Sequence, residues 1–231
     1  MNVIEAKDLY KIYADGDQQI NAVNGVNLTI EKGEFTAIVG PSGSGKTTLL
    51  NMIGGLDKPS MGSIKIDQEE MSSLSANQLI DFRLNNIGFV FQAYNLIPVL
   101  TAEENVEFTM LLQKRPYDER KKRVKELLEK VGLAERHKNR PSELSGGQQQ
   151  RVAVARALAP KPKFILADEP TANLDSKSTE NLLDLMLEMN KEEGITFLFS
   201  THDQRVIDHA RRVIKLEDGK IKSDEKHVFE K

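Results

Sequence analysis

A glycine-rich stretch at residues 40–47 constrains the fold of this chain more than any other part of its sequence. The stretch fits the pattern G-x-x-x-x-G-K-[ST] at every required position. An apolar run at 34–39 precedes it, and a helix-like segment at 48–53 follows it. Glycines let such a loop turn its backbone N–H groups toward an anion, and the start of the following helix adds partial positive charge. The sequence therefore predicts a phosphate-binding loop between a buried strand and a helix.

The loop also predicts which side chains handle a polyphosphate and its cation. Lys46 places a mobile positive charge where the β- and γ-phosphates bind, and the Thr47 hydroxyl is the expected magnesium ligand. We therefore expect ATP and Mg²⁺ as the ligands of this loop. The residues predicted to contact the nucleotide here are Gly40, Pro41, Ser42, Gly43, Ser44, Gly45, Lys46, Thr47 and Thr48.

Two adjacent acids follow a second apolar run, at 164–167. Because ligands of parallel sheets bind at the carboxyl ends of the strands, we expect Asp168 and Glu169 beside the phosphate loop. Asp168 is then a magnesium ligand, directly or through water, and Glu169 is the general base that accepts a proton from the attacking water. Without the loop, the same pair would indicate only an ordinary solvent-exposed strand end.

The N-terminal part of the chain reads as strands. Segments 3–13 and 22–30 are β-rich and flank the turn signal Asp15-Gly16, and 63–67 alternates with period two. These segments predict an antiparallel β subdomain near the N-terminus.

The middle of the chain has helical signals instead. Thr101 and Glu104 form a capping box, and a second helix is expected from about Asp118 to a stop at Gly132. We expect a mostly helical insert at about 93–145.

The last third alternates between the two patterns. A strand is expected at 164–167, a helix from about Ser176, a strand at 196–200 and a hairpin at 213–221. Strands that alternate with helices predict a parallel sheet in an α/β core.

Composition excludes several classes of function. The chain has 231 residues and no cysteine, which excludes disulfides, thiolate zinc sites and thiol catalysis. Its formal net charge is −3, so no overall positive charge favours binding of nucleic acid. Its start lacks the pattern of a signal peptide, and no window reaches the ~18 apolar residues of a membrane helix. The basic run 121–123 is expected to be solvated surface. We expect a cytoplasmic protein that reaches a membrane through a partner.

The segment Leu144–Gln148, with the sequence LSGGQ, separates this chain from most other proteins with a phosphate loop. Ser145 and Gln148 form a capping box, which on its own indicates a capped helix without a ligand. The Ser145 hydroxyl and the following N–H groups can equally hold an anion. With the phosphate loop before it and the acidic pair after it, the chain resembles the ABC transporter ATPases over nearly its whole length.

This resemblance implies further site residues. Gln92 is similar to the family's glutamine that touches magnesium and moves with the membrane partner. His202 is similar to the switch histidine near the γ-phosphate, and both residues join Glu169 as catalytic candidates. Tyr13 corresponds to the aromatic residue that stacks on adenine; Tyr10 is the rival for this role, and the spacing to the loop favours Tyr13.

The resemblance also implies an assembly. It predicts a single nucleotide-binding domain over 1–231, with an α/β phosphate-loop core, an antiparallel β subdomain and a helical subdomain at about 93–145. Two chains would form a head-to-tail homodimer around two ATP molecules, with 173–175 crossing the interface. ATP hydrolysis would power a separate integral membrane permease, which would hold the chain at the inner face of the cell membrane. The residues expected to touch the ATP of the opposite subunit are Ser145, Gly146, Gly147 and Gln148.

The subgroup and two other classes stay open at this point. A related ATPase type serves cell division. ABC ATPases of DNA repair or ribosomes usually carry coiled coils or a second phosphate loop, which this sequence lacks, and a small-molecule kinase is disfavoured by Leu144–Gln148 and His202. The transported substrate is not indicated. The segments that resemble the lipoprotein-release and macrolide-export ATPases are 55–59, 88–92, 95–98 and 146–151.

Overall fold

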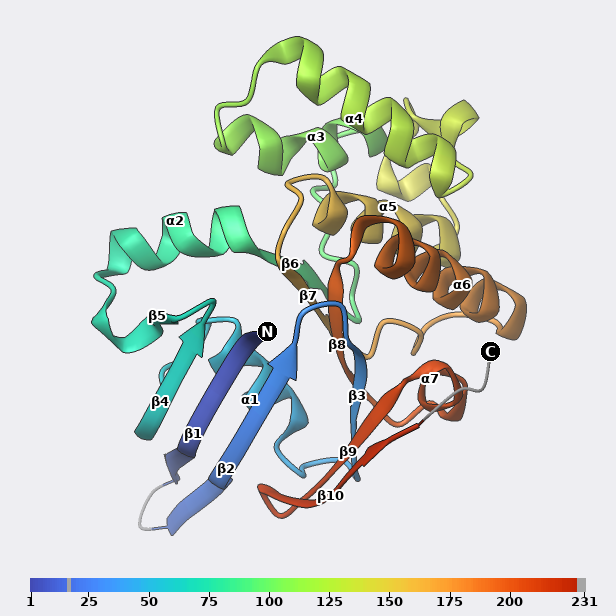
Figure 1. The fold of residues 1–231 in the computed structure, drawn as a ribbon. Coiled ribbons are helices and arrows are strands. Elements are labelled where there is room, and N and C mark those ends of the chain that lie inside the picture. Colours follow the sequence, from blue (N-terminus) through green and yellow to red (C-terminus); the bar gives the residue numbers. More distant parts are fainter. Residues whose placement is uncertain (16–17, 228–231) are drawn as a thin grey trace.

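The computed structural model describes residues 1–15 and 18–227, and its strands form two sheets (Figure 1). The smaller sheet has the order β2-β1-β4-β5, and the larger sheet has the order β10-β9-β3-β8-β7-β6. The smaller sheet contains β1 (Asn2–Asp15), β2 (Gln18–Glu31), β4 (Met61–Ile66) and β5 (Glu69–Glu70). The larger contains β3 (Phe35–Val39), β6 (Ile87–Val90), β7 (Phe164–Asp168), β8 (Thr196–Thr201), β9 (Arg212–Glu217) and β10 (Lys220–Lys226).

The smaller sheet is antiparallel throughout, as the sequence predicts. β1 pairs with β2 and with β4, so that Ile4 lies between Ile30 and Ile66. Gly16, in the predicted turn between β1 and β2, lies outside the described residues.

The larger sheet is parallel from β9 to β6, and β10 is added antiparallel to β9. The prediction of an α/β core with a parallel sheet is therefore confirmed. Because β3, β8, β7 and β6 are parallel neighbours, their carboxyl ends meet at one edge of the sheet.

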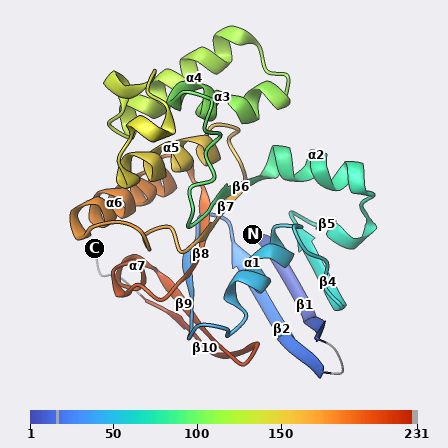
Figure 2. The ribbon, with the colours of Figure 1, turned by 180° about the vertical axis from the view of Figure 1, so that it is seen from behind.

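Helices and short 3-10 turns connect these strands (Figures 1 and 2). Those in the first half are α1 (Lys46–Ile53), η1 (Met71–Ser73), α2 (Ala76–Asn86) and α3 (Ala102–Leu112). Those in the second half are α4 (Tyr117–Lys130), η2 (Ala134–Arg136), η3 (Pro141–Glu143), α5 (Gly146–Leu158), α6 (Ser176–Glu193) and α7 (Gln204–His209).

The two faces of the larger sheet bury different partners because side chains alternate along each strand. On one face, Ile38 and Leu198 join the core with α1 and the antiparallel sheet. On the other face, Phe35, Phe197 and Phe199 join α5 and α6, with the Phe35 and Phe199 ring centroids 4.6 Å apart. The sheet is thus the middle layer, and α1 contacts both sheets.

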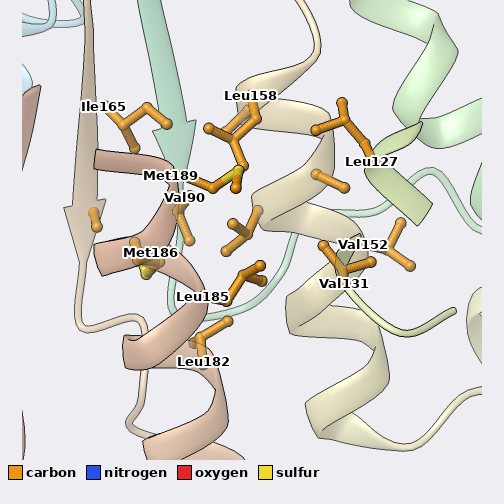
Figure 3. Packing of buried hydrophobic residues seen from close by; sticks show 14 of the residues in the cluster. Val90, Leu127, Val131, Val152, Leu158, Ile165, Leu182, Leu185, Met186 and Met189 are labelled. Carbon is orange, nitrogen blue, oxygen red and sulfur yellow. The ribbon is translucent and has the colours of Figure 1, made fainter. Parts of the chain in front are cut away.

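The helices at 102–158 extend the apolar core on the α5–α6 face away from the larger sheet, as Figures 1 and 3 show. Leu127 and Val131, at the end of α4, pack with Val152 of α5, and Leu158 continues this core toward Met189 of α6. Thr101 caps α3 through the predicted box with Glu104. One apolar cluster therefore holds the helical region to the α/β core.

The expectation that 121–123 is solvated surface is wrong for Arg123. Its side chain is only 6% exposed and forms an ion pair of 2.7 Å with Glu193 at the end of α6. It also donates to the Leu158 carbonyl oxygen. Lys121 is half-buried and pairs with Glu107 at 2.9 Å, so only Lys122 of this run is exposed. Arg123 thus joins α4, α5 and α6.

Within residues 1–15 and 18–227, no helix combines the length and the apolar character needed to span a bilayer.

Candidate functional site

The four strand ends that meet at one edge of the larger sheet border a cavity of about 610 Å³. β3 leads into the phosphate loop, and β8, β7 and β6 end just before His202, Glu169 and Gln92. All lining residues except Ala22 are predicted from the sequence. The lining residues are Ala22, Gly40, Pro41, Ser42, Gly43, Gly45, Lys46, Thr47, Thr48, Gln92, Glu169 and His202.

The backbone path of the loop requires glycine at two positions. Gly45 has φ +99°, and a Cβ there would lie 2.1 Å from the Ala22 carbonyl oxygen. A Cβ on Gly40 would lie 2.0 Å from the Leu216 carbonyl oxygen. At these two positions the loop passes β2 and β9 closely enough to exclude any side chain, and this close packing fixes the path of its backbone.

Lys46 begins α1 and lines this cavity. Its side chain folds back, and Nζ donates to the carbonyl oxygens of Gly40 at 2.8 Å and Pro41 at 3.0 Å. The residue is 8% exposed, and no carboxylate of the described residues pairs with it. A buried ammonium without a counter-charge is costly, so an anion that enters the cavity gains a strong partner.

Ser44, also in the loop, carries a second unsatisfied group. The Ser44 Oγ is buried, and it finds no hydrogen-bond partner in the part of the chain that the structure describes. Of the loop residues 40–48 that the sequence predicts to contact the nucleotide, Ser44 alone does not line the cavity, so the Lys46 cation is the group that fits a phosphate chain.

The groups expected to hold magnesium also lie together. The Thr47 hydroxyl donates to the Asp168 carboxylate at 3.1 Å, across from the phosphate loop, and Gln92 lines the same cavity. Hydroxyl, carboxylate and amide oxygens are the donors that Mg²⁺ prefers, and Mg²⁺ usually takes few protein ligands because phosphates and waters supply the rest. These residues therefore fit a magnesium ion bound together with a nucleotide.

Glu169 has an unusual backbone conformation that aims its side chain at the cavity. Its φ is +45°, a left-handed conformation that costs a residue with a side chain roughly 1–2 kcal/mol. Its backbone N–H donates to the Ser200 carbonyl oxygen at 2.8 Å. One carboxylate oxygen lies 2.7 Å from Nδ1 of His202, and the other accepts from Thr201 at 3.2 Å. The end of β8 thus fixes the orientation of this acid.

The loop that follows Glu169 contacts two other segments near the cavity. Asn173 donates from its side chain to the Gln92 carbonyl oxygen at 3.0 Å. Thr171 donates to the Asp203 carboxylate at 2.8 Å, next to His202. The loop after Glu169 therefore contacts the chain beyond both β6 and β8.

The LSGGQ segment lies apart from the cavity of its own chain. Ser145 is exposed and caps α5, and the box with Gln148 forms as predicted. None of the four predicted residues at 145–148 lines the cavity. A Cβ on Gly146 would meet the Tyr94 hydroxyl at 2.8 Å, so α5 begins tightly packed against the chain after β6.

Tyr13 also lies outside the cavity lining, although its neighbour in space, Thr48, is part of it. The ring is 41% exposed, and its hydroxyl donates to Asp57 at 2.7 Å. Burial first, and then the Asp57 carboxylate, raise the pKa of the phenol. Tyr10 packs instead against Gly25, so of the two tyrosines Tyr13 presents the more open ring.

Sequence reasoning missed Ala22. It lies on β2, and its carbonyl oxygen borders the phosphate loop where Gly45 approaches it. An alanine whose backbone atom forms the wall has no recognisable sequence signal, because any residue supplies the same carbonyl group.

An α/β core with this loop, this buried lysine and this acidic pair defines a nucleoside-triphosphate-binding protein of the phosphate-loop class. The comparisons with known proteins narrow the class. The model of the ABC transporter family matches residues 23–172, and the chain belongs to this family. It is an ABC ATPase, the ATP-binding and ATP-hydrolysing type of subunit.

Similar proteins cover nearly all of the chain. An ABC transporter ATP-binding protein of Thermotoga maritima is 49% identical over 224 residues, which are 97% of this chain and 95% of that protein. The macrolide export ATP-binding/permease protein MacB of Mannheimia succiniciproducens is 47% identical over 228 residues, or 98% of this chain. This chain spans only 35% of that longer protein.

The fold has close counterparts among solved structures. The ATP-binding cassette MJ0796 of Methanocaldococcus jannaschii, solved as a dimer in a post-hydrolysis state with ADP and Pi, matches with a TM-score of 0.91. The identity is 47%, over 98% of this chain and all of that one. The predicted fold class and family are confirmed.

Proposed function

We propose that this chain, over 1–231, is a single nucleotide-binding domain that closes as a homodimer on ATP and drives a separate membrane permease of the lipoprotein-release or macrolide-export type. The observation that carries the proposal is the buried Lys46 ammonium, which faces the cavity without a carboxylate partner among the described residues, beside the ordered Glu169–His202 pair. The similarity to the ATP-binding part of MacB supports the permease type.

The arrangement supports in-line hydrolysis of the γ-phosphate. Glu169 accepts a proton from water, the water oxygen bonds to the γ-phosphorus, and the bond to the bridging oxygen breaks, which yields ADP and phosphate. His202 holds Glu169 in place through the 2.7 Å contact. Mg²⁺, held by Thr47, Asp168 and Gln92, would neutralise the developing phosphate charge.

The position of the LSGGQ segment supports completion of the site by a second copy. Ser145 is exposed at the start of α5 yet lies outside the cavity of its own chain. A helix start with exposed N–H groups binds phosphate well. In a head-to-tail dimer, Ser145, Gly146, Gly147 and Gln148 would contact the ATP held by the other copy. The dimeric structure of the similar cassette MJ0796 supports this arrangement.

A second depression offers a docking place for the permease. This α2–α5 groove, of about 380 Å³, is lined by residues of α2, α3, α5 and the chain around β6, and it reaches Phe91, next to Gln92. Ile80 is 53% exposed on its rim, and the Phe89 and Phe91 rings stack inside it with centroids 5.7 Å apart. A segment seated there would move with Gln92, and the chain would sit at the inner face of the membrane through this contact.

The charge of the groove suggests the chemistry of that segment. Arg83 donates to the Gly55 carbonyl oxygen, and Arg156 donates to those of Tyr94 and Asn95. Burial lowers the pKa of Arg156, and neither arginine has a carboxylate partner within residues 1–15 and 18–227. A short apolar permease helix that carries two carboxylates would compensate both charges. Arg83→Glu should therefore reduce the amount of permease that co-purifies, whereas Arg151→Glu, a control on α5 outside the groove, should not.

Mixing two inactive variants tests the proposed site. Lys46→Ala removes the phosphate contact, and Ser145→Arg blocks the contact to the opposite ATP, so each homodimer should be inactive. In a mixed head-to-tail dimer, one site combines an intact phosphate loop with an intact Ser145, so an equal mixture should recover up to about a quarter of the wild-type sites. If the mixture stays inactive while wild type mixed with either variant is active, the two-chain site is wrong.

A further inference from the structure

Gln150 is a buried amide on α5 that the catalytic arrangement above does not use. Its side chain is 0% exposed, and Nε2 donates to the Pro170 carbonyl oxygen at 2.7 Å. Its Oε1 is buried and has no hydrogen-bond partner in the described chain. Farther along α5, Val152, Ala153 and Val154 are fully buried and apolar. An apolar side chain at position 150 would avoid the cost of a buried, unpaired oxygen. What the amide provides, and an apolar side chain does not, is the N–H donor.

The bonded carbonyl belongs to the residue after Glu169. Glu169 has the left-handed φ of +45°, which persists only where neighbouring groups fix the backbone on both sides. On its N-terminal side, the Glu169 N–H is fixed by the Ser200 carbonyl oxygen at 2.8 Å. On its C-terminal side, the Pro170 carbonyl oxygen is fixed by Gln150, and Pro170 has no N–H to contribute.

The other side-chain anchors of this loop lie farther along the chain. Thr171 bonds Asp203, and Asn173 bonds the Gln92 carbonyl oxygen. The Glu169 carbonyl oxygen itself accepts only a local turn bond, from the Ala172 N–H at 3.3 Å. Gln150 therefore provides the hydrogen bond to the residue next to the base, and it does so from the buried side.

We propose that Gln150 is a positioning residue for Glu169: its hydrogen bond to Pro170 holds the left-handed backbone that aims the carboxylate at the nucleotide cavity. This inference rests on the proposed role of Glu169 as general base. Because Gln150 lies on the helix that Ser145 caps, the same bond joins the segment proposed to contact the partner's ATP to the base of its own chain. Displacement of α5 at one ATP would then move the base at the other.

The test compares Gln150→Met with Gln149→Met. Both glutamines lie on α5 and donate through Nε2 to a carbonyl oxygen, but Gln149 bonds Leu144, away from Glu169. Methionine keeps the size of the side chain and removes the donor. Gln150→Met should lower kcat by about tenfold, as loss of one hydrogen bond permits, and leave the KM for ATP unchanged. Gln149→Met should change neither value.

A double-variant cycle separates positioning from general damage. In a Glu169→Gln background the base is already removed, so adding Gln150→Met should not lower the residual rate further. Thermal unfolding of each variant monitors folding, and Gln150→Asn, which keeps an amide but is one methylene shorter, should show the same loss of kcat as a second variant.

The outcomes distinguish the two assignments. If Gln150→Met and Gln150→Asn keep the kcat of Gln149→Met while Glu169→Gln is inactive, the positioning role is overturned and the base is retained. The positioning role is also overturned if Gln150→Met lowers the residual rate of Glu169→Gln by its full factor. If Glu169→Gln hydrolyses ATP at the wild-type rate, both the base and the positioning role are refuted.

Discussion

Replacing Gly45 by alanine should disrupt the phosphate loop much more than a glycine-to-alanine change elsewhere. The new Cβ would lie 2.1 Å from the Ala22 carbonyl oxygen, in a backbone with φ +99°. The left-handed conformation alone costs about 1–2 kcal/mol. Overpacking against a fixed backbone atom adds roughly 1–3 kcal/mol. The sum, about 2–5 kcal/mol, corresponds to a fall in Tm of about 4–20 °C for a domain of this size.

Gly33→Ala is the matched control for this change. Gly33 has φ +80°, and a Cβ there would meet nothing within 4 Å, so only the conformational cost of about 1–2 kcal/mol applies. Scanning calorimetry measures both Tm values, and titration calorimetry with magnesium-ATP measures affinity. Gly45→Ala should lose ATP binding by displacing the loop from β2, whereas Gly33→Ala should bind normally. Equal Tm losses, together with wild-type affinity in Gly45→Ala, would refute the close approach of β2 to the loop.

Three further predictions concern charge and ligand binding. Arg123→Met should lower Tm, because it leaves Glu193 partly buried without its partner. Removal of one member of a buried ion pair costs up to about 3–5 kcal/mol of folding free energy. The affinity for ATP, measured by calorimetry, should not change. Arg212 holds the pKa of Asp224 below its usual range, so this pair stabilises the fold above the ordinary carboxyl pKa of about 4 and the contribution disappears as pH falls through the lower folded value. Asp224→Asn should therefore lower Tm at pH 7. Between pH 5 and pH 2, the Tm of the variant should fall less than that of wild type, by roughly the contribution of one carboxyl group. Parallel curves of Tm against pH for variant and wild type would contradict this. Lys46→Ala should weaken magnesium-ATP binding strongly, and an unchanged dissociation constant would disprove the phosphate-loop assignment.

The sequence is most informative where function depends on consecutive residues. The phosphate loop, the acidic pair and the LSGGQ segment are local patterns, and each lies at the strand end or helix start that its pattern predicts. The capping boxes at Thr101 and Ser145 also form as expected. The box of Ser75 and Gln78 before α2 has the same signature in the sequence and could have predicted that helix.

What the sequence does not predict depends on pairing between distant segments. The partner of Arg123 is 70 positions away, so a helical pattern alone cannot distinguish a buried arginine from a solvated one. Ala22 contributes a carbonyl oxygen, and the role of Gln150 follows from a bond to Pro170 that only the packing of α5 on the loop creates. The bond between Tyr13 and Asp57 likewise joins residues 44 positions apart.

Dimer formation by Glu169→Gln tests the proposed mechanism most directly. The substitution preserves the size of the side chain and leaves Lys46, Thr47 and Asp168 in place, but the amide cannot accept a proton from water. Hydrolysis should fall by about 10²–10⁴-fold. Size-exclusion chromatography with magnesium-ATP, alongside a phosphate-release assay, should show a stable dimer with two ATP for the variant and little stable dimer for wild type. A variant that hydrolyses ATP at the wild-type rate would remove Glu169 from catalysis, and an inactive variant that never dimerises would contradict the two-chain ATP site.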